Sequence, residues 1–304
     1  MVDITHKRNT LRTAIAEATV HMGSPATIQA IRDHQVPKGN VLDIARSAGY
    51  FAVKNTSSAI PDCHPLPVEY TDVRYEFSET SIRIILTVKT VYKTGVEVEA
   101  MNGAAVVALT MYDMLKPIDK NVEIKNIRLV EKKGGKSDFM SRPDHLSASV
   151  IVCSDSISAG GKTDRAGLAI QEKLKTYGVS INDYLIIPDD LEEIRSQVLD
   201  KVDKSHLIIF TGGTGLSARD ITPEALEPLI ERRIPGIEEA IRAYGQERTP
   251  YSMLSRSVAG TIGHTLILAL PGSTRGAIES MDAVFPSILH IFRILRGSKH
   301  YQHE

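Results

Sequence analysis

The sequence predicts two domains of different class, an α+β domain followed by an α/β domain with a mostly parallel sheet. The chain has 304 residues, which is too long for one ordinary core and suits two domains of about 150 residues each. A polar segment with glycine and proline, residues 134–147, separates two different patterns. Before it predicted strands come in pairs, whereas after it strands and helices alternate. We therefore expect a first domain over 1–138, a linker over 139–146 and a second domain over 147–304.

The composition indicates a globular protein and excludes several classes of partner. Apolar residues make up 42% and charged residues 24%, and no apolar run reaches the ~18 residues that cross a bilayer. The amino terminus lacks the pattern of a signal peptide, so we expect a cytoplasmic protein without membrane contact. The net charge of −1 gives no reason to expect nucleic acid as a partner. Cys63 and Cys153 fall in different halves, which excludes a disulfide framework and a zinc site of CxxC type.

The first domain is predicted to contain an antiparallel sheet with helices on one face. We expect a helix from Thr10 to about Arg32 and another from Asn40 to about Asn55, followed by a broken, proline-rich segment at 60–67. The remaining elements are a strand at 68–77 with period-two alternation, a strand at 81–92, a helix at 98–115 and a strand at 122–132. Strands paired by hairpins with helices on one face form an α+β sandwich, here expected to be ferredoxin-like.

The second domain alternates strands with helices, which predicts a three-layer sandwich around a largely parallel sheet. The predicted strands cover 147–155, 180–188, 206–215 and 265–273, with helices at 164–178, at 191–202 and after the last strand. Ligands of such sheets bind beyond the carboxyl ends of the strands. Three loops are expected there, at 154–161, 210–220 and 270–274.

The glycine-rich loop after the third of these strands is the strongest local signal. Its glycines let the backbone approach a ligand and point amide groups at an anion. Thr222 followed by Pro223 predicts a helix start, with Thr222 as the N-cap. Asp220 offers a hard oxygen ligand suited to magnesium. A tight strand-to-helix turn without any ligand is an equally good explanation of the glycines, and the pattern matches neither GxxxxGK[ST] nor GxGxxG.

Two further loops carry candidate site residues. Pro188, Asp189 and Asp190 precede a predicted helix, and an N-cap explains only one of the two carboxylates. The other, Asp189, is a candidate ligand of a metal or substrate. Ser273 presents a hydroxyl and amides at a helix start, as anion sites require. Asp155, after the first strand, is more simply a turn residue.

Taken together, residues 211–225, 188–190 and 270–274 resemble the molybdopterin-binding domain of the molybdopterin adenylyltransferase family, and the match covers about 147–297. The resemblance implies that the domain binds Mg2+, ATP and molybdopterin and transfers AMP to the terminal phosphate of the pterin. It implies catalytic and magnesium-binding roles for Asp189 and Asp220. The implied pocket residues are Gly212, Gly213, Thr214, Gly215 and Ser273. A pterin-binding or oligomerisation module without adenylyltransferase activity stays open as the alternative, whereas a metal-dependent phosphatase is disfavoured because no nucleophile or His-rich cluster is present.

The first domain resembles cyclic pyranopterin monophosphate synthase over residues 3–138. Six ordered motifs carry this resemblance, at 2–4, 38–41, 63–66, 93–100, 112–116 and 134–137. It implies conversion of the 3′,8-cyclic form of dihydro-GTP to cyclic pyranopterin monophosphate with release of pyrophosphate. The implied catalytic residues are Lys38, His64, Asp113 and Lys116, and the implied substrate contacts are Arg12, Asp62, Cys63, His64, Val98, Glu99 and Lys136. Asp62 stands where the family usually has an apolar residue. The chain would then join a lyase and a nucleotidyltransferase of molybdenum cofactor biosynthesis.

The residue types of the first domain suit that chemistry. A triphosphate without an obvious metal site needs cations, for which Lys38, Lys116, Lys136 and Arg12 are candidates. Asp113, Glu99 and His64 can transfer protons. Without the resemblance, simpler explanations are as good or better. Asp113 and Lys116 share a helical face as a weak surface ion pair does, His64 precedes a proline as a turn residue does, and Cys63 can be a small buried apolar residue.

The spacing of Glu99 and Asp113 predicts an oligomer. They are 14 residues apart, which on a continuous helix is roughly 21 Å along the axis. Unless Asn102 and Gly103 break the helix, the two carboxylates cannot serve one centre in one chain. We therefore expect a site shared between subunits of an obligate homo-oligomer, a hexamer or a trimer, with other enzymes of the pathway as further candidate partners.

Overall fold

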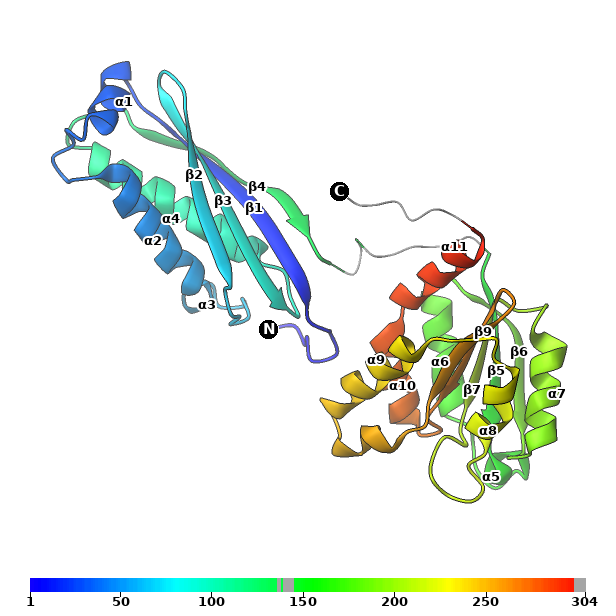
Figure 1. Cartoon of the computed structure of the whole chain (residues 1–304). Coiled ribbons are helices and arrows are strands. Elements are labelled where there is room, and N and C mark those ends of the chain that lie inside the picture. The colour runs from blue at the N-terminus through cyan, green and yellow to red at the C-terminus, as the bar shows by residue number, and fades with distance from the viewer. Residues whose placement is uncertain (136–137, 139–144, 298–304) are drawn as a thin grey trace. The chain divides into compact units, whose positions relative to one another are not determined.

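The structure, a computed structural model, describes residues 1–135, 138 and 145–297. The chain forms two compact units, Met1–Asp138 and Phe139–Glu304 (Figure 1). Most of the expected linker, residues 139–144, lies outside the described residues, and the first strand of the second unit begins at Ser147. No helix in the described ranges combines the length and the apolar character that crossing a bilayer requires.

The first unit is built on a four-stranded antiparallel sheet in the order β2-β3-β1-β4. Two helices, α2 and α4, cover one face of this sheet (Figure 1), and α1 and the short α3 lie at its ends. The strands are β1 (Thr10–His21), β2 (Tyr70–Phe77), β3 (Ser81–Tyr92) and β4 (Glu123–Lys133). The helices are α1 (Pro25–Arg32), α2 (Val41–Lys54), α3 (Thr56–Ala59) and α4 (Glu97–Leu115). The element order is therefore β-α-α-α-β-β-α-β.

The expected helix from Thr10 to Arg32 is wrong over its first half, because Thr10–His21 is the inner strand β1. Alanine favours helices, but Ala14, Ala16 and Ala18 are fully buried at every second position, as in a strand. They belong to the core that α4 also enters, where small side chains let the helix approach the sheet. Pairing with β3 and β4 on both sides overrides the local helix propensity of alanine.

The second unit has a six-stranded sheet in the order β6-β5-β7-β10-β9-β8. The four strands expected from the sequence run parallel at its centre and one edge: β5 (Ser147–Cys153), β6 (Ser180–Ile187), β7 (Leu207–Thr211) and β10 (Thr265–Leu270). Two strands that the sequence pattern did not reveal add an antiparallel edge: β9 (Val258–Ile262) and the two-residue β8 (Arg232–Arg233).

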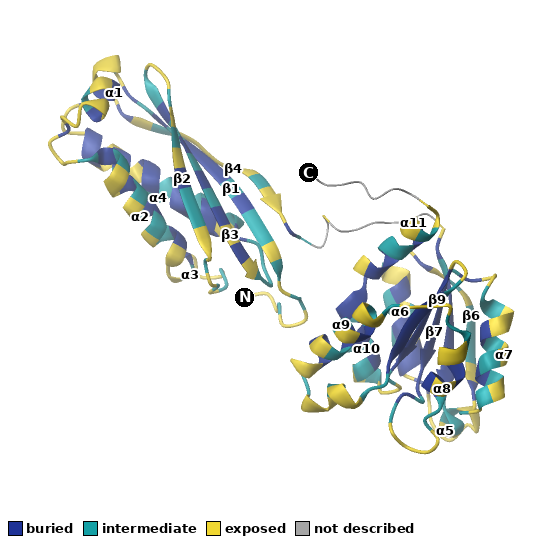
Figure 2. Cartoon of the chain, viewed as in Figure 1, coloured by how far each residue is buried: buried dark blue, intermediate teal, exposed yellow. Residues whose placement is uncertain are grey.

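Helices cover both faces of this sheet, as the expected three layers require (Figure 1). Leu207 and Ile209 of β7 enter one core, and Ile208 and Phe210 enter the other, so the strand is buried on both sides (Figure 2). The longer helices are α6 (Ala166–Thr176), α7 (Leu191–Lys201), α9 (Pro235–Gln246) and α10 (Thr274–Val284). The shorter ones are α5 (Asp155–Ser158), α8 (Thr222–Leu226), η2 (Glu227–Leu229), η3 (Pro250–Leu254), η4 (Ser287–His290) and α11 (Ile291–Leu295).

Candidate active sites

Asp113, near the end of α4, lies between two lysines. Its Oδ2 is 2.6 Å from Nζ of Lys38, and its Oδ1 is 2.7 Å from Nζ of Lys116. The Lys38 ammonium also donates a hydrogen bond to the backbone carbonyl of Asp113, at 2.9 Å. Hydrogen bonds from Lys116 and Lys38 hold the pKa of Asp113 at about 2, so this exposed side chain is a carboxylate at neutral pH. The structure thus brings together three of the predicted catalytic residues.

Glu99, in the first turn of α4, lies in a different environment. Its side chain is buried, and its Oε1 accepts a hydrogen bond from the Cys63 thiol at 3.1 Å. Burial raises the pKa of Glu99, and burial together with Glu99 raises the pKa of Cys63 to about 12. Cys63 is therefore a protonated, only partly buried thiol with a polar partner, not simply a buried apolar residue.

The residues around Cys63 are tied to the amino terminus. The His64 ring Nε2 lies 2.8 Å from the carbonyl oxygen of Val2, and Asp62 forms an ion pair with the amino-terminal ammonium group at 2.6 Å. Val98, beside Glu99, is exposed. These side chains lie at the start of α4, so they do not join the Asp113 cluster at its other end.

Helix α4 continues without a break through Asn102 and Gly103. A Cβ on Gly103 would lie 2.5 Å from Cγ2 of Val53, so this glycine allows α2 and α4 to pack closely. The separation of 14 positions between Glu99 and Asp113 then corresponds to roughly 21 Å along the helix axis. Within one chain the two carboxylates do not converge.

A cavity of about 300 Å³ opens beside the first residue of α4, Glu97. The Arg12 guanidinium in it is fixed by the carbonyl oxygens of Tyr92 and Lys93, each at 3.3 Å. The cations that line the cavity are Lys7, Arg12, Lys93, Lys132 and Lys133. Of these the sequence singled out only Arg12, although Lys93 lies in one of the motifs. The predicted contact Lys136 lies outside the described residues.

In the second unit, the glycine-rich loop fits against its neighbours so closely that side chains are excluded. Gly212 has φ +107°, and a Cβ there would lie 2.1 Å from the carbonyl oxygen of Cys153. Gly213 has φ +62°, and its Cβ would lie 2.3 Å from Oγ1 of Thr222. The loop at 270–274 reaches the same place, since a Cβ on Gly272 would lie 2.9 Å from Cα of Gly212. The loops at 210–220 and 270–274 therefore meet.

Thr222 is not the N-cap that the sequence suggested. It is the first residue of α8, and Ile221 precedes the helix without a side-chain cap. The Thr222 hydroxyl instead donates to the carbonyl oxygen of Gly212 at 2.9 Å, while its amide donates to that of Gly213 at 3.1 Å. The threonine thus holds the glycine turn, which a local capping rule does not foresee.

Three aspartates gather beside this turn. The amide of Asp189 donates to Oδ1 of Asp155, and the amide of Asp155 donates to Oδ2 of Asp189, both at 3.1 Å. Oδ1 of Asp189 is buried and has no hydrogen-bond partner among the described residues. Burial raises the pKa of Asp189. The hydrogen bond from the Asp155 amide opposes this rise, and the negative charges of Asp155 and Asp220 add to it. Asp155, which the sequence suggested was a turn residue, thus belongs to the site, where its Oδ2 also pairs with Arg219 at 2.6 Å.

The two neighbouring carboxylates at 189–190 have different roles. Oδ1 of Asp190 accepts a hydrogen bond from the amide of Glu193 at 2.9 Å, so Asp190 is the N-cap of α7. Asp189 is left for the site. Asp220 is held by the amide of Ser217, which donates to its Oδ2 at 2.8 Å, and hydrogen bonds from Ser217 lower the pKa of Asp220.

Magnesium was expected at Asp189 and Asp220. Within the described ranges, no group of three or more His, Cys, Asp or Glu side chains is arranged to hold a metal. Magnesium in nucleotide sites, however, is commonly held by one or two carboxylates together with phosphate oxygens and water. The unpartnered Oδ1 of Asp189 offers such an oxygen. These residues therefore fit a magnesium ion that arrives with a nucleotide.

Arg256 joins the site although no sequence pattern singled it out. Its Nε donates to the carbonyl oxygen of Gly215 at 2.8 Å, and its Nη2 donates to that of Asp220 at 2.6 Å. It lies two residues before β9, one of the strands that the sequence pattern did not reveal.

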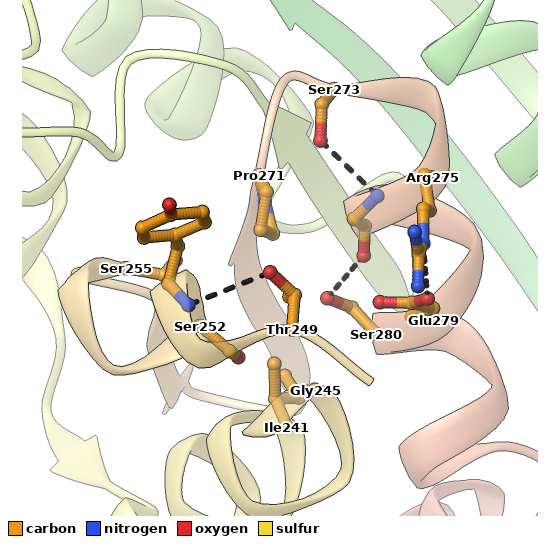
Figure 3. A pocket seen from close by; sticks show the side chains of 12 residues that line it. Ile241, Gly245, Thr249, Ser252, Ser255, Pro271, Ser273, Arg275, Glu279 and Ser280 are labelled. Atoms are coloured by element: carbon orange, nitrogen blue, oxygen red, sulfur yellow. Dashed lines mark hydrogen bonds and ion pairs between the residues drawn. The ribbon is translucent and has the colours of Figure 1, made fainter. Parts of the chain in front are cut away.

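A second cavity of about 300 Å³ lies between α10 and the segment formed by α9 and η3 (Figure 3). Ser273 lines it, and its Oγ accepts a hydrogen bond from the Gly276 amide at 3.2 Å, which caps α10. Figure 3 shows Ser273, Arg275 and Ser280 on one side of the cavity and Thr249, Ser252 and Ile241 across it. Because Gly272 meets Gly212, this cavity borders the glycine turn.

Comparison with known proteins agrees with the division of the chain into two units. Residues 1–135 match the family model described as MoaC family, and residues 149–290 match the one described as probable molybdopterin binding domain. The chain is 41% identical over 301 residues to the molybdenum cofactor biosynthesis bifunctional protein of Chlorobaculum tepidum, covering 99% of this chain and 96% of that protein. It is 35% identical over 315 residues to the Synechococcus elongatus protein of the same name, covering 99% and 98% respectively.

The first unit alone also has relatives. It is 48% identical over 139 residues to the cyclic pyranopterin monophosphate synthase of Clostridium perfringens, which covers 45% of this chain and 87% of that protein. Fold and sites thus define a two-domain enzyme of molybdenum cofactor biosynthesis. The chain belongs to the family of molybdenum cofactor biosynthesis bifunctional proteins, and its first unit is a domain of the cyclic pyranopterin monophosphate synthase type.

Proposed function

We propose that the first unit converts the 3′,8-cyclic form of dihydro-GTP to cyclic pyranopterin monophosphate and releases pyrophosphate. The observation that supports this most is the cavity lined by Lys7, Arg12 and Lys93. Lys7 and Lys93 form no ion pair with the residues that the structure describes, so their charges are available to an anion. Lysine and arginine are suited to hold a triphosphate where no metal does so.

The reaction needs two functions, which we assign to the cationic cavity and to the Asp113 cluster. A cyclic monophosphate forms when a hydroxyl oxygen of the substrate attacks the α-phosphorus and the bond to the β-phosphate breaks. The hydroxyl proton must be accepted, and the leaving pyrophosphate must be neutralised. Lys7, Arg12 and Lys93 serve the second need. Asp113 serves the first, since it becomes a better proton acceptor when the substrate draws Lys38 and Lys116 away from it.

Each such site is built by two subunits of a homo-oligomer, because Glu99 and Asp113 lie at opposite ends of the unbroken α4. This can be tested by co-expressing two inactive full-length variants, Asp113→Asn and Glu99→Gln. Each variant alone is expected to lose about 10²-fold or more in synthase activity. The mixture is expected to recover about a quarter of wild-type activity, since random pairing restores one intact site in each mixed pair of subunits.

The matched control combines two variants of the same cluster, Asp113→Asn with Lys116→Ala. This mixture is expected to recover nothing, because every shared site then lacks one member of the cluster. A fully active monomer, or equal activity of both mixtures, would contradict the shared site.

For the second unit we propose transfer of AMP from ATP to molybdopterin. An oxygen of the terminal phosphate of the pterin attacks the α-phosphorus of ATP, and pyrophosphate leaves. The unpartnered Oδ1 of Asp189 beside the glycine turn supports this proposal most. Asp189 and Asp220 would hold magnesium, which neutralises phosphate charge when bound. The amides of Gly212–Gly215 and the Ser273 hydroxyl orient the phosphates.

The test is to incubate the full chain with molybdopterin, ATP and magnesium and to detect AMP-bound pterin and pyrophosphate. Asp189→Asn is expected to lower the rate by about 10²–10³-fold. Asp190→Asn is the matched control, because Asp190 caps α7 and Asn is an equally good cap. Pterin binding without any product would favour the alternative, a binding module without adenylyltransferase activity.

A further inference from the structure

We propose that Arg256 is a positioning residue that fixes Asp220 and the glycine-rich loop for group transfer, an inference that rests on the function proposed for the second unit. Its guanidinium bridges two carbonyl oxygens that are five positions apart in the chain, those of Gly215 and Asp220, at 2.8 Å and 2.6 Å. Its backbone amide donates to the carbonyl oxygen of Thr214 at 3.0 Å. One residue thus closes the segment from Thr214 to Asp220 into a ring.

The Asp220 carboxylate is thereby held from two sides. Arg256 fixes its backbone, and the amide of Ser217, inside the same ring, donates to its Oδ2 at 2.8 Å. The remaining nitrogen of the guanidinium pairs with Glu224 in α8, which sets the plane of the group. Three partners in different directions require the planar fork of arginine, and an ammonium cannot replace it.

The strands that the sequence pattern did not reveal explain how Arg256 reaches the loop. It lies just before β9, which pairs with β10 at the edge of the parallel strands. The β9 ladder therefore fixes the backbone of Arg256 relative to β10 and β7, from which the glycine-rich loop departs. The Arg256 side chain is two-thirds buried, with 33% exposed.

The positioning role is tested on the full chain with Arg256→Ala, Arg256→Lys and the control Arg242→Ala. Arg242 and Arg256 both line a cavity next to Pro223 and Glu224 of α8. Arg242 is about equally exposed, at 32%, but its guanidinium pairs with Glu238. Arg256→Ala and Arg256→Lys are each expected to lower kcat about 10²-fold, with KM for ATP changed less than about threefold. Added guanidinium ions are expected to restore at least tenfold of the loss in Arg256→Ala, whereas ethylammonium ions restore none. Arg242→Ala is expected to keep full activity.

Hydrogen exchange supplies a readout that does not need a reaction. Arg256→Ala is expected to speed amide exchange over residues 213–220, guanidinium to reverse the change, and Arg242→Ala to leave it unaltered. If the wild-type chain forms no AMP-bound pterin, the proposed function fails, and this exchange measurement alone decides on Arg256. Unchanged exchange, or a kcat of Arg256→Lys within threefold of wild type, would overturn the inference.

Should Arg256→Ala fail to fold, Glu224→Gln takes its place. It leaves the arginine in position but removes the charge that orients it, and it is expected to lower kcat about tenfold with unchanged KM for ATP. A loss of thermal stability in Glu224→Gln without any change in kcat would assign Arg256 a purely structural role and overturn the proposal.

Discussion

The two units gather their ionisable residues in different ways. In the second unit Asp155, Asp189 and Asp220 follow β5, β6 and β7, which are neighbours in a parallel sheet. Parallel strands all end at one edge, so residues that follow them converge within one chain. In the first unit the candidate residues lie at the two ends of α4 beside an antiparallel sheet. A long helix separates its ends, so in the proposed site a second subunit brings them together.

The two sites also differ in how their charges are balanced. Asp113 has two lysines as partners, and the cavity of the first unit is rich in cations, which suits a bare polyphosphate. Asp189 instead has a buried oxygen without a hydrogen-bond partner among the described residues, and two other carboxylates lie nearby. That arrangement suits a nucleotide that brings its own cation. The parallel sheet of the second unit thus brings its site residues together within one chain, but within the described ranges the negative charge of the three aspartates there is not balanced by cationic side chains as that of Asp113 is.

The largest expected effect comes from removing one carboxylate from each site. Asp113→Asn is expected to lower synthase activity by about 10²–10⁴-fold, since it removes the proposed proton acceptor. Asp220→Asn is expected to lower AMP transfer by about 10²–10³-fold, since it removes a proposed magnesium ligand. Each variant of the full chain is assayed for both reactions. Loss of both reactions from one substitution would break the comparison, because the sites would then not be independent.

A smaller effect is expected on folding stability when alanine replaces a glycine in an open turn, at Gly39, or in a crowded turn, at Gly213. Gly39 in the first unit has φ +100°, but its nearest neighbour to an added Cβ is Cδ1 of Ile44 at 3.6 Å. Gly213 has φ +62° and a neighbour at 2.3 Å. Gly39→Ala is therefore expected to destabilise its unit by about 1–2 kcal/mol, from backbone strain alone. Gly213→Ala is expected to destabilise its unit by about 1–3 kcal/mol more than that.

Gly178 provides the control within the second unit. Its φ is +76°, and nothing lies within 4 Å of an added Cβ, so Gly178→Ala should resemble Gly39→Ala. Unfolding enthalpies and midpoints from calorimetry of the full chain measure all three variants. If Gly213→Ala lowered the stability of the second unit no more than Gly178→Ala does, the turn at Gly213 would be packed less tightly than its contacts indicate.

Features that depend on residues close together in the chain were predicted better from the sequence than contacts between residues that only the fold brings together. The parallel strands, the loops after them, and the pair Asp113 and Lys116 follow from local patterns. The strand β1 does not, because Ala14 and Ala16 favour a helix until β3 and β4 pair with them. Arg256 and the role of Asp155 depend on contacts between distant segments, so no spacing in the sequence points to either.

The smallest expected effect is on folding stability, where the ionised side chains of Asp113 and Asp189 act in opposite directions. The pKa of Asp113 is lowered from 3.8 to about 2 by Lys116 and Lys38, so its contribution to stability is complete above pH 3.8 and is lost as the pH falls towards 2. The pKa of Asp189 is raised mainly by burial, so the folded unit binds more protons and loses stability as the pH rises above 3.8.

At neutral pH, Asp113→Asn should therefore lower the melting temperature of the first unit, and Asp189→Asn should raise that of the second while AMP transfer is lost. Calorimetry of the full chain between pH 3 and pH 7 measures both, and the effect of Asp113→Asn should shrink at the acid end. Opposite signs would mean that the first site is stabilised by its charges and the second is destabilised by them until a cation binds. Equal signs would mean that the buried oxygen of Asp189 finds a partner in solution, and the contrast in charge balance would fail.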